Sequence, residues 1–280
     1  MIELPEAVHL ARQLTRTARG KEVRAVAAAH TDHAFAWYHG DPGGYDALLR
    51  GRTVEGAASH GGFVELDLGG ARLLFAEGVG LRWHGPGEAA PPKHQLHVRF
   101  DDGSALSATV RLYGGLWAFE VGGFDNPYYA RAVTAPSPLT DAFDHGHFAS
   151  LRSAPAAQKL SLKGLLATEQ RIPGLGNGVL QDVLFAARLH PRRRVASLTE
   201  GEAAALFAAV KGTLADMAGR GGRDTEGDLF GRPGGYATVL SRRTLRTPCP
   251  RCGATIVKES FLGGAVYACP GCQPVRPAAA

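Results

Sequence analysis

The chain of 280 residues lacks the long apolar run of a membrane-spanning helix and the pattern of a signal peptide. No apolar run approaches the roughly 18 residues that a membrane helix needs, and the N-terminus has no basic segment followed by an apolar one. Cysteine is absent from the first 248 residues, and no lysine lies between Glu22 and Pro92. We therefore expect a soluble, cytoplasmic protein with reduced thiols.

An excess of acidic residues is also missing. Lys and Arg number 31 against 26 Asp and Glu, which gives a formal net charge of +5. A basic balance favours a polyanionic partner such as a nucleic acid, although many basic proteins bind nothing anionic. The length predicts about two domains, each large enough to bury a core.

The four cysteines that are present lie in the last 32 residues as two Cys-x-x-Cys pairs separated by sixteen residues. This spacing is typical of a four-thiolate zinc site, and two disulfides are the alternative. Between the pairs, TIVKESFLGGAVYA predicts two short strands around a turn at Gly263-Gly264. We expect a zinc ribbon with one structural Zn²⁺, whose ligands are Cys249, Cys252, Cys269 and Cys272.

The first half of the chain predicts one helix and then many strands. Pro5 suits the first turn of a helix, an apolar stripe follows it, and Gly20 ends the helix. Short apolar or alternating runs with Gly, Asp and Pro between them then predict a β-sandwich or barrel. These runs are residues 22–30, 33–39, 62–68, 71–76, 94–100, 105–113 and 116–121.

The second half is expected to be helical, because apolar residues recur there at intervals of three and four. The helical patterns cover residues 142–153, 160–170, 177–189 and 200–219, and Thr199 with Glu202 has the spacing of a capping box for the last of them. The turn RIPGLGN joins the second and third patterns in a helix, two-turn, helix arrangement. Such a turn can direct backbone N–H groups at a phosphate, but Gly-rich turns are more often a matter of geometry alone.

These pieces, in this order, resemble the formamidopyrimidine-DNA glycosylase and endonuclease VIII family. The resemblance covers residues 1 to about 273 and depends on the N-terminal frame x-E-L-P-E, KH at 93–94, R-x-Y-G at 111–114, P-L-x-D-x-F at 138–143, PGLGN, ARLHP and the four-Cys ribbon. It implies an α+β multidomain fold with double-stranded, damaged DNA in a cleft between the domains. The parts are the N-terminal helix and β-sandwich (1–125), a linker (126–142), the helix-two-turn-helix domain (143–240), the zinc ribbon (241–273) and a disordered tail (274–280).

The resemblance also implies roles for individual residues. Glu3 matches the acid that assists opening of the deoxyribose, while the amine of the N-terminal residue attacks C1′, so Met1 and Ile2 join Glu3 as catalytic candidates. The alternative for Glu3 is that it only complements a helix dipole. Tyr113 matches an aromatic wedge that fills the stack after base flipping. The residues expected to hold DNA are His94, Arg111, Tyr113, Lys159, Lys163 and Asn177, with Lys159 one helical turn before Lys163.

Three departures from the family pattern affect the expected chemistry. Ile2 stands where the family has the proline whose amine is the nucleophile, and so large a second residue is expected to leave Met1 in place. No lysine occurs in the hairpin segment SHGGFVELDL, and Gly264 stands where the family's zinc hairpin has an arginine. These changes predict weak or absent AP lyase activity.

Three hypotheses follow from the sequence. The first is a monomeric DNA glycosylase of base excision repair that excises a damaged base with Glu3. The second is a catalytically silent binder of DNA lesions or DNA structures on the same scaffold. The third is a zinc-ribbon module that interacts with RNA, which explains the ribbon but not the other motifs.

Overall fold

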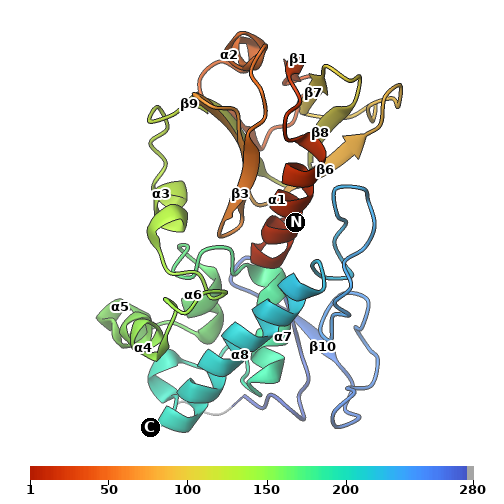
Figure 1. Cartoon of the computed structure of the whole chain (residues 1–280). Helices are drawn as coiled ribbons and strands as arrows, with labels where there is room; N and C mark the ends of the chain where they lie inside the picture. Colours follow the sequence, from red (N-terminus) through yellow and green to blue (C-terminus); the bar gives the residue numbers. More distant parts are fainter. Residues whose placement is uncertain (276–280) are drawn as a thin grey trace.

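The computed structural model describes residues 1–275, which form a strand-rich N-terminal half and a helical second half with helix α1 between them (Figure 1). Helix α1 (Leu4–Ala18) packs against the N-terminal sheets and against helix α8 of the second half. Within the described residues, no helix is both long and apolar enough to cross a membrane. Residues 276–280 of the tail expected to be disordered lie outside the described residues.

The N-terminal half is a β-sandwich, as predicted. One sheet has four strands in the order β1-β7-β8-β6, and the other has five in the order β2-β9-β5-β4-β3, in which β2 and β9 are parallel. Apolar side chains of both sheets and of α1 form one continuous core. The strands are β1 (Val23–Ala28), β2 (Ala36–Trp37), β3 (Gly56–His60), β4 (Phe63–Asp67), β5 (Ala71–Phe75), β6 (Val79–His84), β7 (Leu96–Phe100), β8 (Ala105–Val110) and β9 (Gly114–Glu120).

Two strands and one helix of this half escape the sequence patterns. Strand β3, GAASH, consists of small residues and a histidine and lacks the composition of a strand, whereas β6 has alternating apolar residues at Val79, Leu81 and Trp83 that the predicted runs do not include. Pairing with β4 and β8 holds them in the sheets. Helix α2 (Tyr45–Leu49) follows a short 3₁₀ turn, η1 (Pro42–Gly44), and packs on β1.

The second half is helical, and the capping box at Thr199 and Glu202 is present. Its apolar residues form a second core, which Leu4 of α1 also joins. The segment 126–142, expected to be a linker, contains helix α3, whose N-cap Asn126 accepts hydrogen bonds from the next turn. The helical elements are α3 (Pro127–Thr134), α4 (His145–Ser153), α5 (Pro155–Gln158), α6 (Leu162–Ala167), α7 (Asn177–Ala186), η2 (Val195–Ser197) and α8 (Glu200–Gly219).

The C-terminal ribbon is the predicted hairpin of β10 (Val257–Phe261) and β11 (Gly264–Ala268), which packs beside α7. The expected turn at Gly263-Gly264 is displaced by one residue. Gly264 already pairs with Phe261, and the turn residues are Leu262 (φ 45°) and Gly263 (φ 71°). A type I′ hairpin turn needs positive φ at both central positions, and the pair 262–263 provides it here.

Candidate functional site

Glu3 lies buried between the two halves of the molecule. Its side chain is 1% exposed although it precedes the first turn of α1. Its Oε1 accepts the backbone N–H of Gly178 at 2.8 Å, and its Oε2 accepts that of Val179 at 2.7 Å. Both donors belong to the first turn of α7, so the carboxylate complements the positive end of a helix in the other domain.

Arg223, in the loop after α8, connects Glu3 to Glu6. Its Nη1 lies 3.6 Å from Glu3 Oε2, while Nη2 and Nε donate to the two oxygens of Glu6 at 2.8 and 3.0 Å. All three side chains are at most 5% exposed. Burial raises the pKa of Glu3 against the opposing charge of Arg223, whereas Arg223 outweighs burial at Glu6 and lowers its pKa.

The glycines of the turn GLGNG make room for this network. A Cβ on Gly176 would lie 2.7 Å from Glu3 Oε1, and one on Gly178 would lie 1.7 Å from Arg223 Nη1. The N–H groups that could have faced a phosphate at Gly178 and Val179 are therefore already occupied by Glu3. In this structure the glycines allow Glu3 and Arg223 to pack closely against the turn, and the turn does not form an open anion site.

The N-terminal amine pairs with a carboxylate other than Glu3. The ammonium of Met1 forms an ion pair with Glu226, in the loop after α8. Met1, Ile2 and Arg111 line a cavity of about 210 Å³ on that side, together with Glu226 and neighbouring residues of its loop. The structure thus places Met1 and Glu3 in different cavities, with the buried Ile2 lining both.

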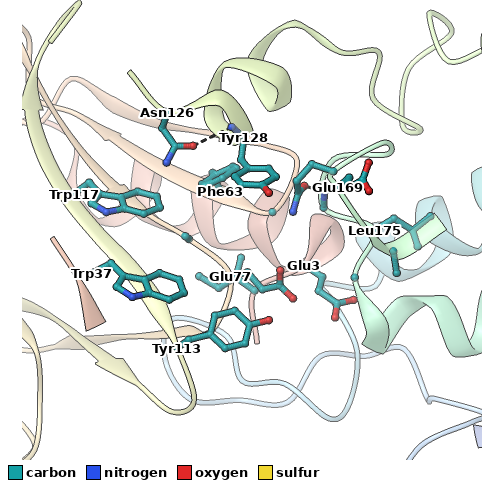
Figure 2. A pocket seen from close by; sticks show the side chains of 17 residues that line it. Glu3, Trp37, Phe63, Glu77, Tyr113, Trp117, Asn126, Tyr128, Glu169 and Leu175 are labelled. Carbon is teal, nitrogen blue, oxygen red and sulfur yellow. Dashed lines mark hydrogen bonds between the residues drawn. The ribbon is translucent and has the colours of Figure 1, made fainter. Parts of the chain in front are cut away.

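A larger cavity of about 360 Å³ opens beside Glu3 (Figure 2). Its walls come from both halves of the molecule, and Glu77 lies next to Glu3 in it. Burial, and next the charge of Glu3, raise the pKa of Glu77 to about 7. No hydrogen bond or ion pair reaches the Glu77 carboxylate from the described residues, so it is free to act on a ligand.

Tyr113 stands at the mouth of this larger cavity. Its ring is 38% exposed and stacks on Trp37, with ring centroids 5.7 Å apart. The predicted wedge residue and the predicted acid Glu3 therefore line one cavity, as do Trp117 and Tyr128 (Figure 2).

The hairpin β3–β4 approaches this cavity with glycine and not with lysine. A Cβ on Gly62 would lie 3.9 Å from Glu3 Cα, and one on Gly61 (φ 56°) would lie 2.6 Å from Cβ of Pro173. The hairpin turn therefore packs tightly against the turn between α6 and α7. No Lys, Arg or His is among the described residues that line the larger cavity.

Lys163 and Asn177 face the zinc hairpin. Lys163 Nζ donates to the carbonyl oxygen of Phe261 at 2.6 Å, and Asn177 Nδ2 donates to that of Ala265 at 2.9 Å. Burial lowers the pKa of Lys163. A Cβ on Gly264 would lie 3.2 Å from Lys163 Nζ, so the position that lacks the family's arginine is next to both residues.

The other residues expected to hold DNA are dispersed. Lys159 is exposed and follows α5, whereas Lys163 is buried in α6, so the expected spacing of one helical turn within a helix is wrong. Ser161 caps α6 and starts the new helix between them. His94 is 7% exposed, its Nδ1 donates to the Pro91 carbonyl, and its ring stacks on His30.

The four cysteines form a site that suits zinc. All are free, and their sulfurs lie within 4.8 Å of one another, with Sγ of Cys249 and Cys272 3.8 Å apart. Tetrahedral thiolates at about 2.3 Å from Zn²⁺ are about 3.8 Å from each other. A Cβ on Gly271 would lie 2.9 Å from Cys252 Sγ, so the close approach of the two Cys-x-x-Cys loops requires glycine there.

We expect purified protein to hold one zinc ion per chain and to lose it in Cys249→Ser or Cys269→Ser. These two cysteines are buried in a small cluster with Ile256, so the ribbon has little other core to hold it together. Metal analysis and limited proteolysis of the ribbon measure both effects, with Ser260→Ala on β10 as the control that keeps its zinc. Freshly prepared protein without zinc would contradict the assignment.

One residue that sequence reasoning missed has a signal in the sequence. Glu6 lies three residues after Glu3, which is the spacing of a capping box. Arg223, Glu226 and Glu77 are separated from Glu3 by long stretches of chain, and no local pattern relates them to it.

Comparisons with known proteins agree with this architecture. The model of the formamidopyrimidine-DNA glycosylase N-terminal domain matches residues 1–111, and that of the formamidopyrimidine-DNA glycosylase H2TH domain matches residues 134–226. Formamidopyrimidine-DNA glycosylases of Symbiobacterium thermophilum and Thermus thermophilus are each 32% identical to this chain, over 98% and 99% of it and over 90% and 100% of their own lengths.

Solved structures give the same result. The crystal structure of the MutM (Fpg) protein of Thermus thermophilus has a TM-score of 0.81 at 28% identity and covers 98% of this chain and 100% of its own. The Lactococcus lactis Fpg in complex with DNA containing an abasic site has a TM-score of 0.80 at 24% identity, with the same coverage. The fold is therefore shared along nearly the whole chain. On the sequence identity and the two matched domains, this chain belongs to the formamidopyrimidine-DNA glycosylase family.

Proposed function

We propose that this protein is a DNA glycosylase of base excision repair that binds damaged duplex DNA, flips a nucleotide and excises its base by hydrolysis. One observation carries the proposal: Glu3, at the position of the family's acid, lines an open cavity beside a second carboxylate, Glu77. The relatives are named formamidopyrimidine-DNA glycosylases, and solved neighbours bind damaged DNA. The thiol-rich zinc site suits the reducing cytoplasm, where we place the protein.

Hydrolysis needs a group that can take a proton from water or give one to the leaving base. Glu3 is held by two N–H groups and Arg223, so its position is fixed, and burial raises its pKa toward the range in which a carboxyl exchanges protons. Glu77 supplies a second carboxylate with a pKa of about 7. The two groups can divide the work of stabilising positive charge at the sugar and accepting the proton of water.

The DNA-holding residues divide into two groups in this proposal. Arg111 and Lys159 are exposed and free to contact phosphates, and exposed Tyr113 fills the space of the flipped base. Lys163 and Asn177 first hold the zinc hairpin in place through Phe261 and Ala265. Their contact with a phosphate then comes at the edge of that hairpin, whereas buried His94 holds its own loop through Pro91 and His30.

Strand nicking is weak or absent in this proposal because the terminal amine is poorly prepared to attack a sugar. The Met1 amine is charged and paired with Glu226, and an ammonium has no lone pair to offer. It also lines the smaller cavity and not the one beside Glu3. The β3–β4 hairpin has Gly62 and the ribbon has Gly264 at places where cations would assist the later steps of strand cleavage.

We expect borohydride trapping on abasic duplex DNA to be about a hundredfold weaker for this protein than for Ile2→Pro, because a misplaced nucleophile costs about that factor. The Ile2→Pro chain becomes a substrate for removal of Met1, so it presents a proline amine in place of the paired ammonium. Gel electrophoresis of the reduced adduct measures the yield. Efficient trapping of the unaltered protein, with mass spectrometry placing the adduct on Met1, would contradict this expectation.

The proposed function itself is tested with duplexes that carry single damaged bases. The protein is incubated with each duplex, and alkali with heat then cuts any abasic site that the protein made but did not cleave. Release of at least one damaged base above the rate on undamaged duplex supports a glycosylase. Tight binding of these duplexes without release of any base would instead identify the catalytically silent binder. That role is compatible with the structure, because both Glu3 oxygens already bind backbone N–H groups of α7.

A further inference from the structure

The larger cavity has an unusual wall for a protein that approaches DNA. Five aromatic side chains surround it, namely Trp37, Phe63, Tyr113, Trp117 and Tyr128. Trp37 and Tyr128 are 48% and 53% exposed, and Figure 2 shows their rings and those of their neighbours around the mouth. Side chains of this size are costly to leave in water, and their faces carry partial negative charge. A flat ligand that enters among them gains both stacking and an electrostatic attraction.

The charges at this cavity have one sign. Glu3, Glu77 and Glu169 line it, and no basic side chain does so within the described residues. Arg171 pairs with Glu169 at 2.5 Å, and Arg223 lies near Glu3, whereas no described side chain pairs directly with Glu77 and only the more distant positive charges of the N-terminus and Arg223 act on it. Near the N-terminus, Glu3 and Glu6 share the single guanidinium of Arg223, and Glu226 pairs with the Met1 ammonium.

We propose that this cavity receives a base that carries a positive charge on its ring, such as a purine alkylated at N3 or N7. The inference rests on the proposed function and specifies its substrate class. Aromatic faces attract a cation, and the attraction strengthens when water is excluded. A cation next to Glu77 favours the ionised form of its carboxyl, and the resulting counter-charge is one that a neutral base cannot use. Phosphates are kept out by the same negative charge, so the sugar and base alone enter.

The chemistry of such a base matches what this chain has and lacks. When the bond between C1′ and the base nitrogen breaks, its electron pair goes to the base and cancels the positive charge, so the base leaves neutral without a proton from the protein. The oxygen of water forms the new bond to C1′, and the proton that it loses passes to the carboxylate of Glu77. Glu3 stabilises the positive charge that develops at the sugar. No terminal amine, hairpin lysine or second elimination takes part.

The smaller cavity does not share these properties. Arg82 and Arg111 line it together with Glu226 and Asp228, so its charges are mixed, and Met1, which pairs with Glu226, lines it too. It has no aromatic side chain among the described residues that line it. A cationic base gains little there, which makes the two cavities distinguishable by mutation.

The first test measures binding without any reaction. Titration of the intact protein with 7-methylguanosine and with guanosine, followed by tryptophan fluorescence, should give about tenfold tighter binding of the methylated cation. Trp37→Leu and Glu77→Gln should each remove most of that difference, whereas Glu120→Gln, an exposed carboxylate at the end of β9, should keep it. Thermal melts establish that each variant is folded. Equal binding of the two nucleosides would overturn the proposal.

The second test compares excision of N7-methylguanine with that of 8-oxoguanine, a neutral purine of similar size, from otherwise identical duplexes. The proposal requires faster release of the methylated base, and a loss of that preference in Glu77→Gln. If the preference changes with Asp228→Asn and not with Trp37→Leu or Glu77→Gln, the smaller cavity holds the base and the proposal is wrong.

The two tests also separate the proposal from the function on which it depends. Preferred binding of 7-methylguanosine without release of any base would remove the glycosylase and keep the cavity's preference for cations. Release of 8-oxoguanine, with no preference for 7-methylguanosine in binding or for N7-methylguanine in excision, would support the glycosylase function and contradict the proposed substrate class.

Discussion

Arg223→Met is expected to lower the free energy of unfolding by about 3–5 kcal/mol, because removal of one member of a buried ionic network leaves the others uncompensated. In this chain Glu3 and Glu6, both at most 5% exposed, would lose their cationic partner. Methionine fills much of the space of the arginine stem, so the effect reports charge and hydrogen bonds more than lost volume. Urea unfolding followed by circular dichroism measures it.

Arg220→Met is the matched control in the same segment. Its guanidinium is 59% exposed and pairs with Asp216 one turn earlier on α8, and such surface pairs contribute less than about 1 kcal/mol. If both variants lose the same stability, the buried network is not what joins the loop after α8 to the N-terminus.

Glu3→Gln is expected to slow base excision by at least about a hundredfold, which is the usual contribution of a positioned acid or base. The carboxamide cannot exchange the proton, and in the observed geometry its NH2 group replaces one of the two oxygens that accept from Gly178 and Val179. One buried donor is then left without a partner, which costs about 1–3 kcal/mol of stability. Single-turnover excision and thermal melts measure the two effects separately.

The comparison for this variant is Glu120→Gln, which changes an exposed carboxylate outside both cavities and should leave excision unchanged. Binding of damaged duplex by folded Glu3→Gln should persist, since the residues that contact DNA are untouched. Excision within tenfold of the unaltered protein would show that Glu3 only holds the domains together.

Local patterns predicted those parts of the fold that depend on local physics. The four-Cys spacing, the capping box at Thr199 and the alternating strands β4, β5 and β8 each have a sequence signal and occur as expected. Strand β3 has a weak signal because pairing with its neighbour β4, and not composition, keeps it extended. Helix α3 lies in a Pro-containing segment that has the composition of a linker, although Asn126 gives it an N-cap.

The partners of the site residues are harder to predict from the sequence than the fold is, for a physical reason. The family resemblance identifies Glu3, but its partners Gly178, Val179 and Arg223 lie at least 175 residues away along the chain. Contacts at that separation have no period in the sequence. The roles of Lys163 and Asn177 as supports for the zinc hairpin likewise depend on how β10 and β11 pack beside α7.

The position of Glu3 at the first turn of α7 has a consequence for the evolution of this family. The same two oxygens that would serve a reaction also bind one domain to the other, so selection for a stable fold preserves the acid even where selection for activity has ended. A descendant that lost its chemistry would change first at groups without such a second duty. Glu77, which contacts no other described side chain through a hydrogen bond or ion pair, is the position whose drift among relatives would record that loss.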